Sequence, residues 1–569
     1  MEKFNAVSFF WNSADLLQCL ADQVTSTYGR AEVCSDVQRR NLVDKFDLSA
    51  LCLVNRACRL AFTPQLYRHI YIFNRYPPEG ANQHRHNARS QMSVLAQNPN
   101  AVYIRTLTVG RCRTWELEEH EALRLLLRRL SSLRSFDVAG VPLEASTVAT
   151  LVSSCRSLSS VHIDLSASMH TIFARHHLGG VDLTRQYRNV GLEVHLGDLA
   201  HLQELCLDHL YGDPEQWIEP IARILHASPG LQKLQLSISQ KAVLDHLSIH
   251  GPDLSFVKTF LLGICTAYKA RGAAPLRLRS FRCGSGVHPN FPSTSDVAFT
   301  DLSSLDDLEV VYLNTSIGVP ASFSSDTYIA GTDRDIPITT FLYDTPRLRC
   351  FTVSRYDTLV HRALSSPLFN PDRARQLAVT WDVLPKTTML GPTTLVRIGA
   401  SPRHHFRMFK IDFRPFAAHE RAQNEAHLDA RGILEGLIDG DDGTLEGLEV
   451  QFHMKGWELY IDLLVEMMPR LTGLTQLLVR LEESASEYSD PRFSYRDAAR
   501  RLAVVVKRLK YVGIGTIGMS FWEVVRGQKG AVPTVTLVDM PLMEEVEAVE
   551  LFGMRKRTPG YVFADRGSI

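Results

Sequence analysis

Apolar residues recur from residue 101 onward in a short pattern, L-x-x-L-x-L, in which any apolar residue can take the place of leucine. The copies are Ile104-Leu107-Val109, Leu133-Phe136-Val138, Leu158-Val161-Ile163, Leu202-Leu205-Leu207, Leu231-Leu234-Leu236, Leu278-Phe281-Cys283, Leu308-Val311-Leu313, Leu348-Phe351-Val353, Phe406-Phe409-Ile411, Leu445-Leu448-Val450, Leu474-Leu477-Val479 and Ile514-Ile517-Met519. The last two apolar positions of each copy share one face of a β-strand, and the first packs at the turn before it. We therefore expect short parallel strands that stack side by side.

Helical stretches between the copies would return the chain to the start of the next strand. They are residues 116–130, 217–226 and 497–509. Three longer insertions, 164–194, 314–345 and 356–402, separate neighbouring copies, and the middle one is rich in Ser, Thr, Asp and Gly, as an exposed loop is. After residue 521, a strand-like VPTVTLV and an acidic helix, MEEVEAVELF, are expected to cap the open end of the array.

A different pattern occupies residues 47–72, which contain two predicted helix starts and a helix-to-strand exit through the apolar Ile70 and Ile72. Asp47 is a good N-cap, and apolar residues then follow helical spacing from Leu48. Thr63 followed by Pro64 predicts a second start, because a hydroxyl caps free N–H groups and proline is tolerated in the first turn. Periodicity alone is also compatible with an ordinary packed helical pair.

The order of residues in this stretch resembles the second half of a fungal F-box, in which a DLxxLxLV helix precedes a PxLYRxI ending. The matching residues are Asp47, Leu48, Leu51, Leu53, Val54, Pro64, Leu66, Tyr67, Arg68 and Ile70. A first helix would lie at 14–24, although the usual Leu-Pro opening is absent and residues 25–44 intervene. The repeats further on resemble a leucine-rich-repeat solenoid, without the Asn or Cys that regular members place three residues after each strand.

These resemblances imply an α/β fold. An F-box-like helical domain (1–75) is followed by a linker (76–100), an irregular leucine-rich-repeat solenoid (101–530) with parallel strands on its concave face and helices outside, and a C-terminal cap (531–569).

The amino-acid composition bears on which classes of partner the chain can bind. Sixty-two basic residues balance 62 acidic ones, so no overall charge draws the chain to nucleic acid or to an anionic membrane. The ten cysteines form no CxxC pair and read as reduced thiols of an intracellular protein, in the cytoplasm, the nucleus or both. Neither a signal peptide nor a membrane-spanning segment is predicted.

Motifs for catalysis or metal binding are not found in the sequence. The acidic run 439–443 departs from a calcium loop in its glycine position and in Val450 at the twelfth place, and reads as a turn. The histidines at 84, 86, 176, 177, 404 and 405 lack a partner at zinc-ligand spacing. No G-x-S-x-G, GxxxxGK[ST] or strand-associated GxGxxG occurs. We therefore expect no cofactor, no metal and no covalent chemistry.

The resemblance implies a substrate-recognition subunit of a cullin-type (SCF) ubiquitin ligase. A Skp-family adaptor would contact Leu48, Leu51, Cys52, Val54, Pro64, Leu66 and Tyr67. An unidentified target protein would contact the concave face, where the predicted strands place Asp137, His162, Asp164, Glu204, Cys206, Asp208, Lys233, Gln235, Arg282, Tyr312, Lys410, Asp412, Glu449 and Arg480. The alternatives are an interaction scaffold without a ubiquitin role, whose helical segment only caps the array, and an enzyme on an irregular α/β fold.

Overall fold

The structure is a computed structural model. It describes residues 49–73, 88–110, 117–165, 192–239, 242, 255–287, 296–313, 341–353, 378–383, 408–413, 431–438, 443, 445–452, 457–481, 495–515, 519–529 and 532–539, apart from 51, 55, 140, 142, 285, 342, 349, 433 and 436. The predicted first helix at 14–24, Leu48, most of the three insertions, the histidine pairs, the acidic run at 439–442 and the acidic helix near the C-terminus lie outside these residues.

The fold is α/β, built on one curved sheet in which every strand pairs with the next strand along the chain. Within the described residues its strands are β1 His69–Phe73, β2 Thr106–Gly110, β3 Ser135–Ala139, β4 Ser160–Asp164, β5 Glu204–Leu210, β6 Lys233–Ile238, β7 Ser280–Cys283, β8 Val310–Leu313, β9 Cys350–Val353, β10 Ala378–Val383, β11 Met408–Phe413, β12 Gly447–Phe452, β13 Gln476–Leu481, β14 Tyr511–Gly515, β15 Met519–Lys529 and β16 Val532–Asp539. The pairings from β1 to β14 are parallel, and β15 and β16 add an antiparallel hairpin.

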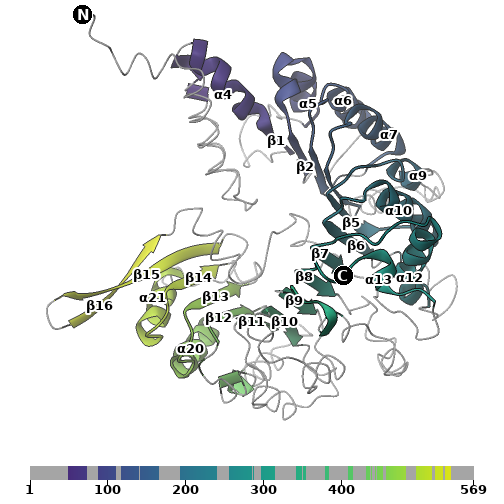
Figure 1. The fold of residues 1–569 in the computed structure, drawn as a ribbon. Coiled ribbons are helices and arrows are strands. Elements are labelled where there is room, and N and C mark those ends of the chain that lie inside the picture. The colour runs from purple at the N-terminus through teal and green to yellow at the C-terminus, as the bar shows by residue number, and fades with distance from the viewer. Residues whose placement is uncertain are drawn as a thin grey trace, which may run out of the picture.

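Helices cover the outer side of the arc and leave the strands to line its inner side (Figure 1). The described helices are α4 Arg56–Arg68, α5 Ala88–Gln97, η1 Pro99–Tyr103, α6 Leu117–Leu127, α7 Ala145–Ser154, α9 Leu192–Leu196, α10 Glu215–Ala227, α12 Ser255–Ala270, α13 Phe299–Leu302, α20 Trp457–Met467, η3 Met468–Arg470 and α21 Tyr495–Val505. The predicted helices at 116–130, 217–226 and 497–509 are confirmed as α6, α10 and α21.

The apolar pattern forms continuous rows across the strands. Register aligns the middle apolar residues of successive copies, including Leu107, Phe136, Val161, Leu205, Leu234, Phe281, Val311 and Phe351. In the copies whose side chains are described, the last two apolar residues are at most 1% exposed. These residues belong to one buried cluster that runs from Ile70 to Leu537. The prediction of stacked parallel strands is therefore confirmed.

The last copy of the pattern is assigned wrongly by the sequence. Val512 and Ile514 of β14 continue the two apolar rows, opposite Leu477 and Val479. The chain then reverses into antiparallel β15, which begins at Met519. Apolar spacing is the same in parallel and antiparallel strands, so the pattern does not reveal the reversal.

Two parallel strands of the sheet are not among the predicted copies of the L-x-x-L-x-L pattern. Ile70 and Ile72, at the predicted helix-to-strand exit, lie in β1, which pairs with β2 in register and is therefore the first strand of the sheet. Strand β10 lies inside the expected insertion 356–402. Its first pattern position is Gln376 rather than an apolar residue, which hides the copy.

Residues 88–97, expected in a linker, instead form α5, which buries Ala88 and Met92 in the core. The predicted second helix start at Thr63-Pro64 is also wrong, since α4 runs through Pro64 to Arg68. Proline there removes the hydrogen bond to the carbonyl of Leu60. Burial of Cys58, Ala61 and Phe62 along the same helix offsets that loss.

Candidate functional site

The N-terminal helical segment has one buried and one exposed side. Residues 49–50 and 52–54 are helical, and α4 follows. Cys58, Ala61, Phe62 and Gln65 of α4 are buried, whereas Leu53 is 84% exposed, Leu60 is 70% exposed and Val54 is 58% exposed. Arg56 and Arg59 are exposed beside them. We call Leu53, Val54 and Leu60 the apolar patch.

The predicted adaptor-binding residues are divided between this patch and the body of the protein. Val54 is exposed, and Pro64 and Leu66 are half-buried. The Cys52 Sγ lies 3.8 Å from the Thr63 hydroxyl. Tyr67 packs against the core, and its hydroxyl accepts a hydrogen bond of 2.9 Å from the Asn98 amide. The side chains of Leu48 and Leu51 lie outside the described residues.

The predicted adaptor-binding residues do not include Leu60, and Leu53 belongs to the prediction only through the F-box-like motif. Both are large apolar side chains that are mostly exposed. What the sequence did not show is which helical face the body of the protein covers.

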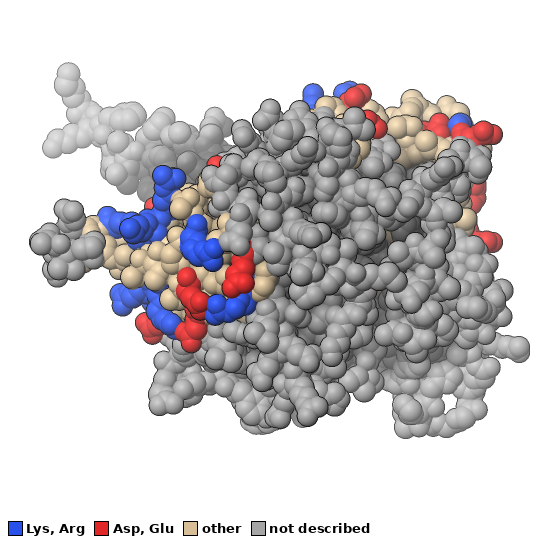
Figure 2. Space-filling view, turned by 90° about the horizontal axis from the view of Figure 1, so that it is seen from below, with Lys and Arg blue, Asp and Glu red and all other residues tan. Residues whose placement is uncertain are grey.

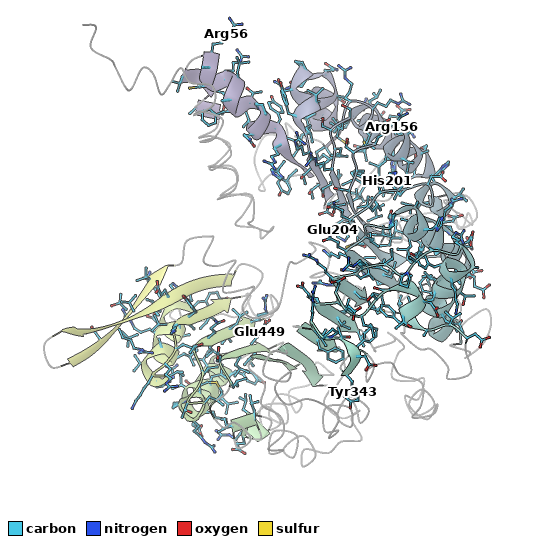
Figure 3. The ribbon with its side chains drawn as sticks, viewed as in Figure 1. Arg56, Arg156, His201, Glu204, Tyr343 and Glu449 are labelled. Carbon is cyan, nitrogen blue, oxygen red and sulfur yellow. The ribbon has the colours of Figure 1, made fainter. Side chains whose placement is uncertain are left out.

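On the inner face of the sheet, the register brings the predicted target-binding residues into line. Asp137, His162, Cys206, Gln235, Arg282 and Tyr312 stand opposite one another on β3 to β8. Glu204 and Lys233 are neighbours in the next row, and Lys410 stands opposite Glu449. Glu204 and Glu449 are labelled on the inner side of the arc in Figure 3, whereas Arg156 lies on the helical side.

A histidine between two carboxylates forms the centre of this face. With both ring nitrogens protonated, His162 donates from Nδ1 to Asp137 Oδ1 over 2.7 Å and from Nε2 to Asp208 Oδ2 over 3.3 Å. Asp208 also accepts from Gln235 Nε2 at 2.7 Å and from the Ser237 hydroxyl at 2.9 Å. We call these five residues the His162 cluster.

The carboxylates fix the charge of this cluster. Burial lowers the pKa of His162, but Asp137 and Asp208 raise it by more, so this pKa lies well above its usual value. Burial raises the pKa of Asp208, but the His162 and Gln235 hydrogen bonds bring it below its usual value. His162 is therefore a charged imidazolium that lies between two carboxylates. Burial raises the pKa of the neighbouring Cys206 thiol, so the cluster does not generate a thiolate nucleophile there.

A second polar contact lies beside the cluster. His209 has a left-handed backbone conformation (φ 55°), where the register between β5 and β6 is interrupted. Its Nδ1 lies 2.8 Å from Asp164 Oδ1, and its backbone N–H donates to the Ser237 hydroxyl over 2.8 Å. The irregular strand end is thus held by side chains instead of by the regular ladder.

A buried ion pair also lies in the C-terminal half of the sheet. Arg480 Nε donates to Glu449 Oε1 over 2.5 Å, with both side chains buried. The contact runs diagonally between β12 and β13, because Glu449 stands opposite Leu478.

Burial separates the predicted target-binding residues into two groups. His162, Asp164, Asp208 and Glu449 are less than a tenth exposed and bind other protein groups. Asp137, Glu204, Lys233, Arg282 and Tyr312 keep partial exposure, although Asp137 also binds His162. The second group is therefore the part of the face available to a partner.

Away from the inner face of the sheet, basic and acidic side chains are interspersed on the surface. Around the last helices and strands of the sheet, basic and acidic side chains lie next to one another (Figure 2), and Arg431 pairs with Glu466 and Arg501 with Asp462. Among the described residues, no three His, Cys, Asp or Glu side chains are arranged to hold a metal ion. The helices described in the structure include none with the length and apolar character to cross a membrane.

Six cysteines have described side chains, and all six are free thiols. Five of them are buried, as the sequence predicts for core thiols. Comparison with known proteins adds no relative, since no protein-family model matches the chain and no curated protein matches it either.

Proposed function

We propose that the chain is the substrate-recognition subunit of a cullin-type ubiquitin ligase, in which the N-terminal helices bind a Skp-family adaptor. The observation that carries this proposal is the apolar patch on a segment whose sequence resembles an F-box. Exposed large apolar side chains that gather on a soluble surface mark an interaction site, and the exposed Leu53, Val54 and Leu60 lie within eight residues of one another in the sequence.

The rest of the chain would hold the target. The parallel strands, joined in sequence order and backed by helices, support an irregular leucine-rich-repeat solenoid whose inner face binds a protein. The partly exposed residues Asp137, Glu204, Lys233, Arg282 and Tyr312 carry both signs of charge and an aromatic ring, which suits a polar protein surface.

In this proposal no residue of the chain performs covalent chemistry. The contribution is proximity, because a target held on the inner face and a ubiquitin-charged enzyme on the same assembly meet as parts of one complex. The alternative is a scaffold in which the N-terminal helices only cap the sheet. The buried face of α4, with Phe62 fully enclosed, fits both proposals, whereas the apolar patch favours an adaptor.

The test is co-elution of the purified chain with a purified Skp-family adaptor on a sizing column. Leu60→Glu should abolish co-elution, because the carboxylate would lose water at the interface without a partner. Leu125→Glu is the matched control, since Leu125 is a 53% exposed leucine on the outer helix α6. Absence of co-elution with the parent chain, or equal loss in both variants, would favour the scaffold.

A further inference from the structure

A polar pocket of about 360 Å³ opens at the edge of the sheet where β2 to β5 begin. It is lined by Arg105, Ser132, Arg134, Ser157, Ser159 and Gln203. Arg105, Arg134, Ser159 and Gln203 each stand immediately before a strand, at matching places in four successive repeats. Arg156 and His201, labelled in Figure 3, belong to the turns that carry Ser157 and Gln203.

The backbone around the pocket is already hydrogen-bonded. Arg134 N donates to the Arg105 carbonyl, Ser159 N to the Arg134 carbonyl and Gln203 N to the Ser159 carbonyl, at 2.6 to 2.8 Å. The Ser159 hydroxyl also donates to the Arg134 carbonyl at 3.2 Å. The groups that remain for a ligand are therefore mainly side chains, two guanidiniums above all.

No described residue neutralises these guanidiniums. Within the described part of the chain, neither Arg105 nor Arg134 forms an ion pair or a side-chain hydrogen bond. They occupy equivalent places on neighbouring strands, which are about 4.8 Å apart. Arg68 holds the same place before β1, so three like charges stand in sequence along this edge, an arrangement that costs stability.

The same edge is neutralised further along the sheet. Arg277 and Arg347, in the turns before β7 and β9, both bind Asp307, in the turn before β8, at 2.7 and 2.8 Å. No carboxylate among the described residues plays that role at Arg105 and Arg134. That no described carboxylate pairs with Arg105 or Arg134 is the observation that points to a bound anion.

We propose that this pocket binds a phosphate monoester group. Two guanidiniums present planar forks of donors that match phosphate oxygens, and the Ser132 and Ser157 hydroxyls supply further donors at the rim. The site lies at the strand edge and not on the apolar patch, so it does not depend on adaptor binding. Its ligand is either a free phosphate monoester or a phosphorylated side chain of a bound protein.

Isothermal titration of the full chain at low ionic strength tests the site, with O-phosphoserine, a phosphoserine peptide, the same peptide without phosphate, and inorganic phosphate as probes. Arg105→Gln and Arg134→Gln should each weaken phosphoserine binding about tenfold or more, since each removes charge-assisted hydrogen bonds. Arg508→Gln should change nothing, because Arg508 is an exposed arginine in the matching turn before β14. Unchanged thermal melts would show that the variants fold.

Tighter binding of the phosphopeptide than of O-phosphoserine would identify a phosphorylated protein segment as the ligand. Equal binding of the two would identify the phosphate group alone, and either result supports the site. Three results would overturn the proposal: no binding of any phosphate probe, equal binding of the unphosphorylated peptide, or affinities unaffected by Arg105→Gln and Arg134→Gln.

Discussion

Replacement of His162 by phenylalanine should destabilise the protein, because it leaves Asp208 with a buried charge and no cation. Loss of one partner of a buried ion pair costs about 3–5 kcal/mol. Asp208 keeps its hydrogen bonds from Gln235 and Ser237, and Asp137 is 16% exposed and regains some water. We therefore expect His162→Phe to lower the free energy of unfolding by about 3–4 kcal/mol, in the lower part of that range.

Urea unfolding followed by circular dichroism at pH 6.5 measures this loss. The control is Asp137→Asn, which keeps an acceptor for His162 and leaves Asp208 in place, and should cost about 1 kcal/mol, because a charged acceptor is replaced by a neutral one. If His162→Phe unfolds at the same urea concentration as the parent, the His162 cluster does not carry the charges assigned to it.

The difference in the free energy of unfolding between the parent and His162→Phe should be smaller at high pH. The pKa of His162 is raised in the folded state, so its stabilising effect is complete below its unfolded value of about 6.5 and is lost as pH rises through the folded pKa. The pKa of Asp208 is lowered, so its contribution is present above its unfolded value of about 3.9 and is lost as pH falls through the folded pKa. The stability difference should therefore be largest between these limits.

Two further predictions test the packing. Leu234→Ala should cost about 2–5 kcal/mol in urea unfolding, because Leu234 is fully buried in the central apolar row, and a melt equal to the parent's would contradict that position. Gly473→Ala should cost about 1–3 kcal/mol in the same assay, since its new Cβ would lie 2.2 Å from the backbone oxygen of Gly443. The control is Gly230→Ala, whose new Cβ would have no neighbour within 4 Å, so this change should be neutral or slightly stabilising.

The repeating rows could be predicted because each strand shows the same apolar spacing, so one error in a copy does not affect the next. The copy at β10 was missed for the opposite reason, since Gln376 replaces the apolar residue by which a single copy is recognised. The strand at β1 was predicted as a helix-to-strand exit, but its place as the first strand of the sheet was not, because it lies before the region of the repeating pattern.

The inner-face chemistry was predicted only in part. Sequence alternation placed Asp137, His162 and Asp208 on one face, but their contacts depend on which strands are neighbours. His162 reaches Asp208 diagonally, since Cys206 stands directly opposite it. Such diagonal contacts depend on register and rotamer, which no single strand encodes. For the same reason the burial of Glu449 could not be read from its polar character.

Hydrogen–deuterium exchange of the full chain, alone and with a saturating Skp-family adaptor, tests the central proposal most directly. If the apolar patch is the adaptor site, peptides that cover residues 49–68 will gain protection on addition of the adaptor, and peptides from β2 to β6 will not change. No gain in protection over 49–68, or protection only on the inner-face strands, would contradict the proposed function.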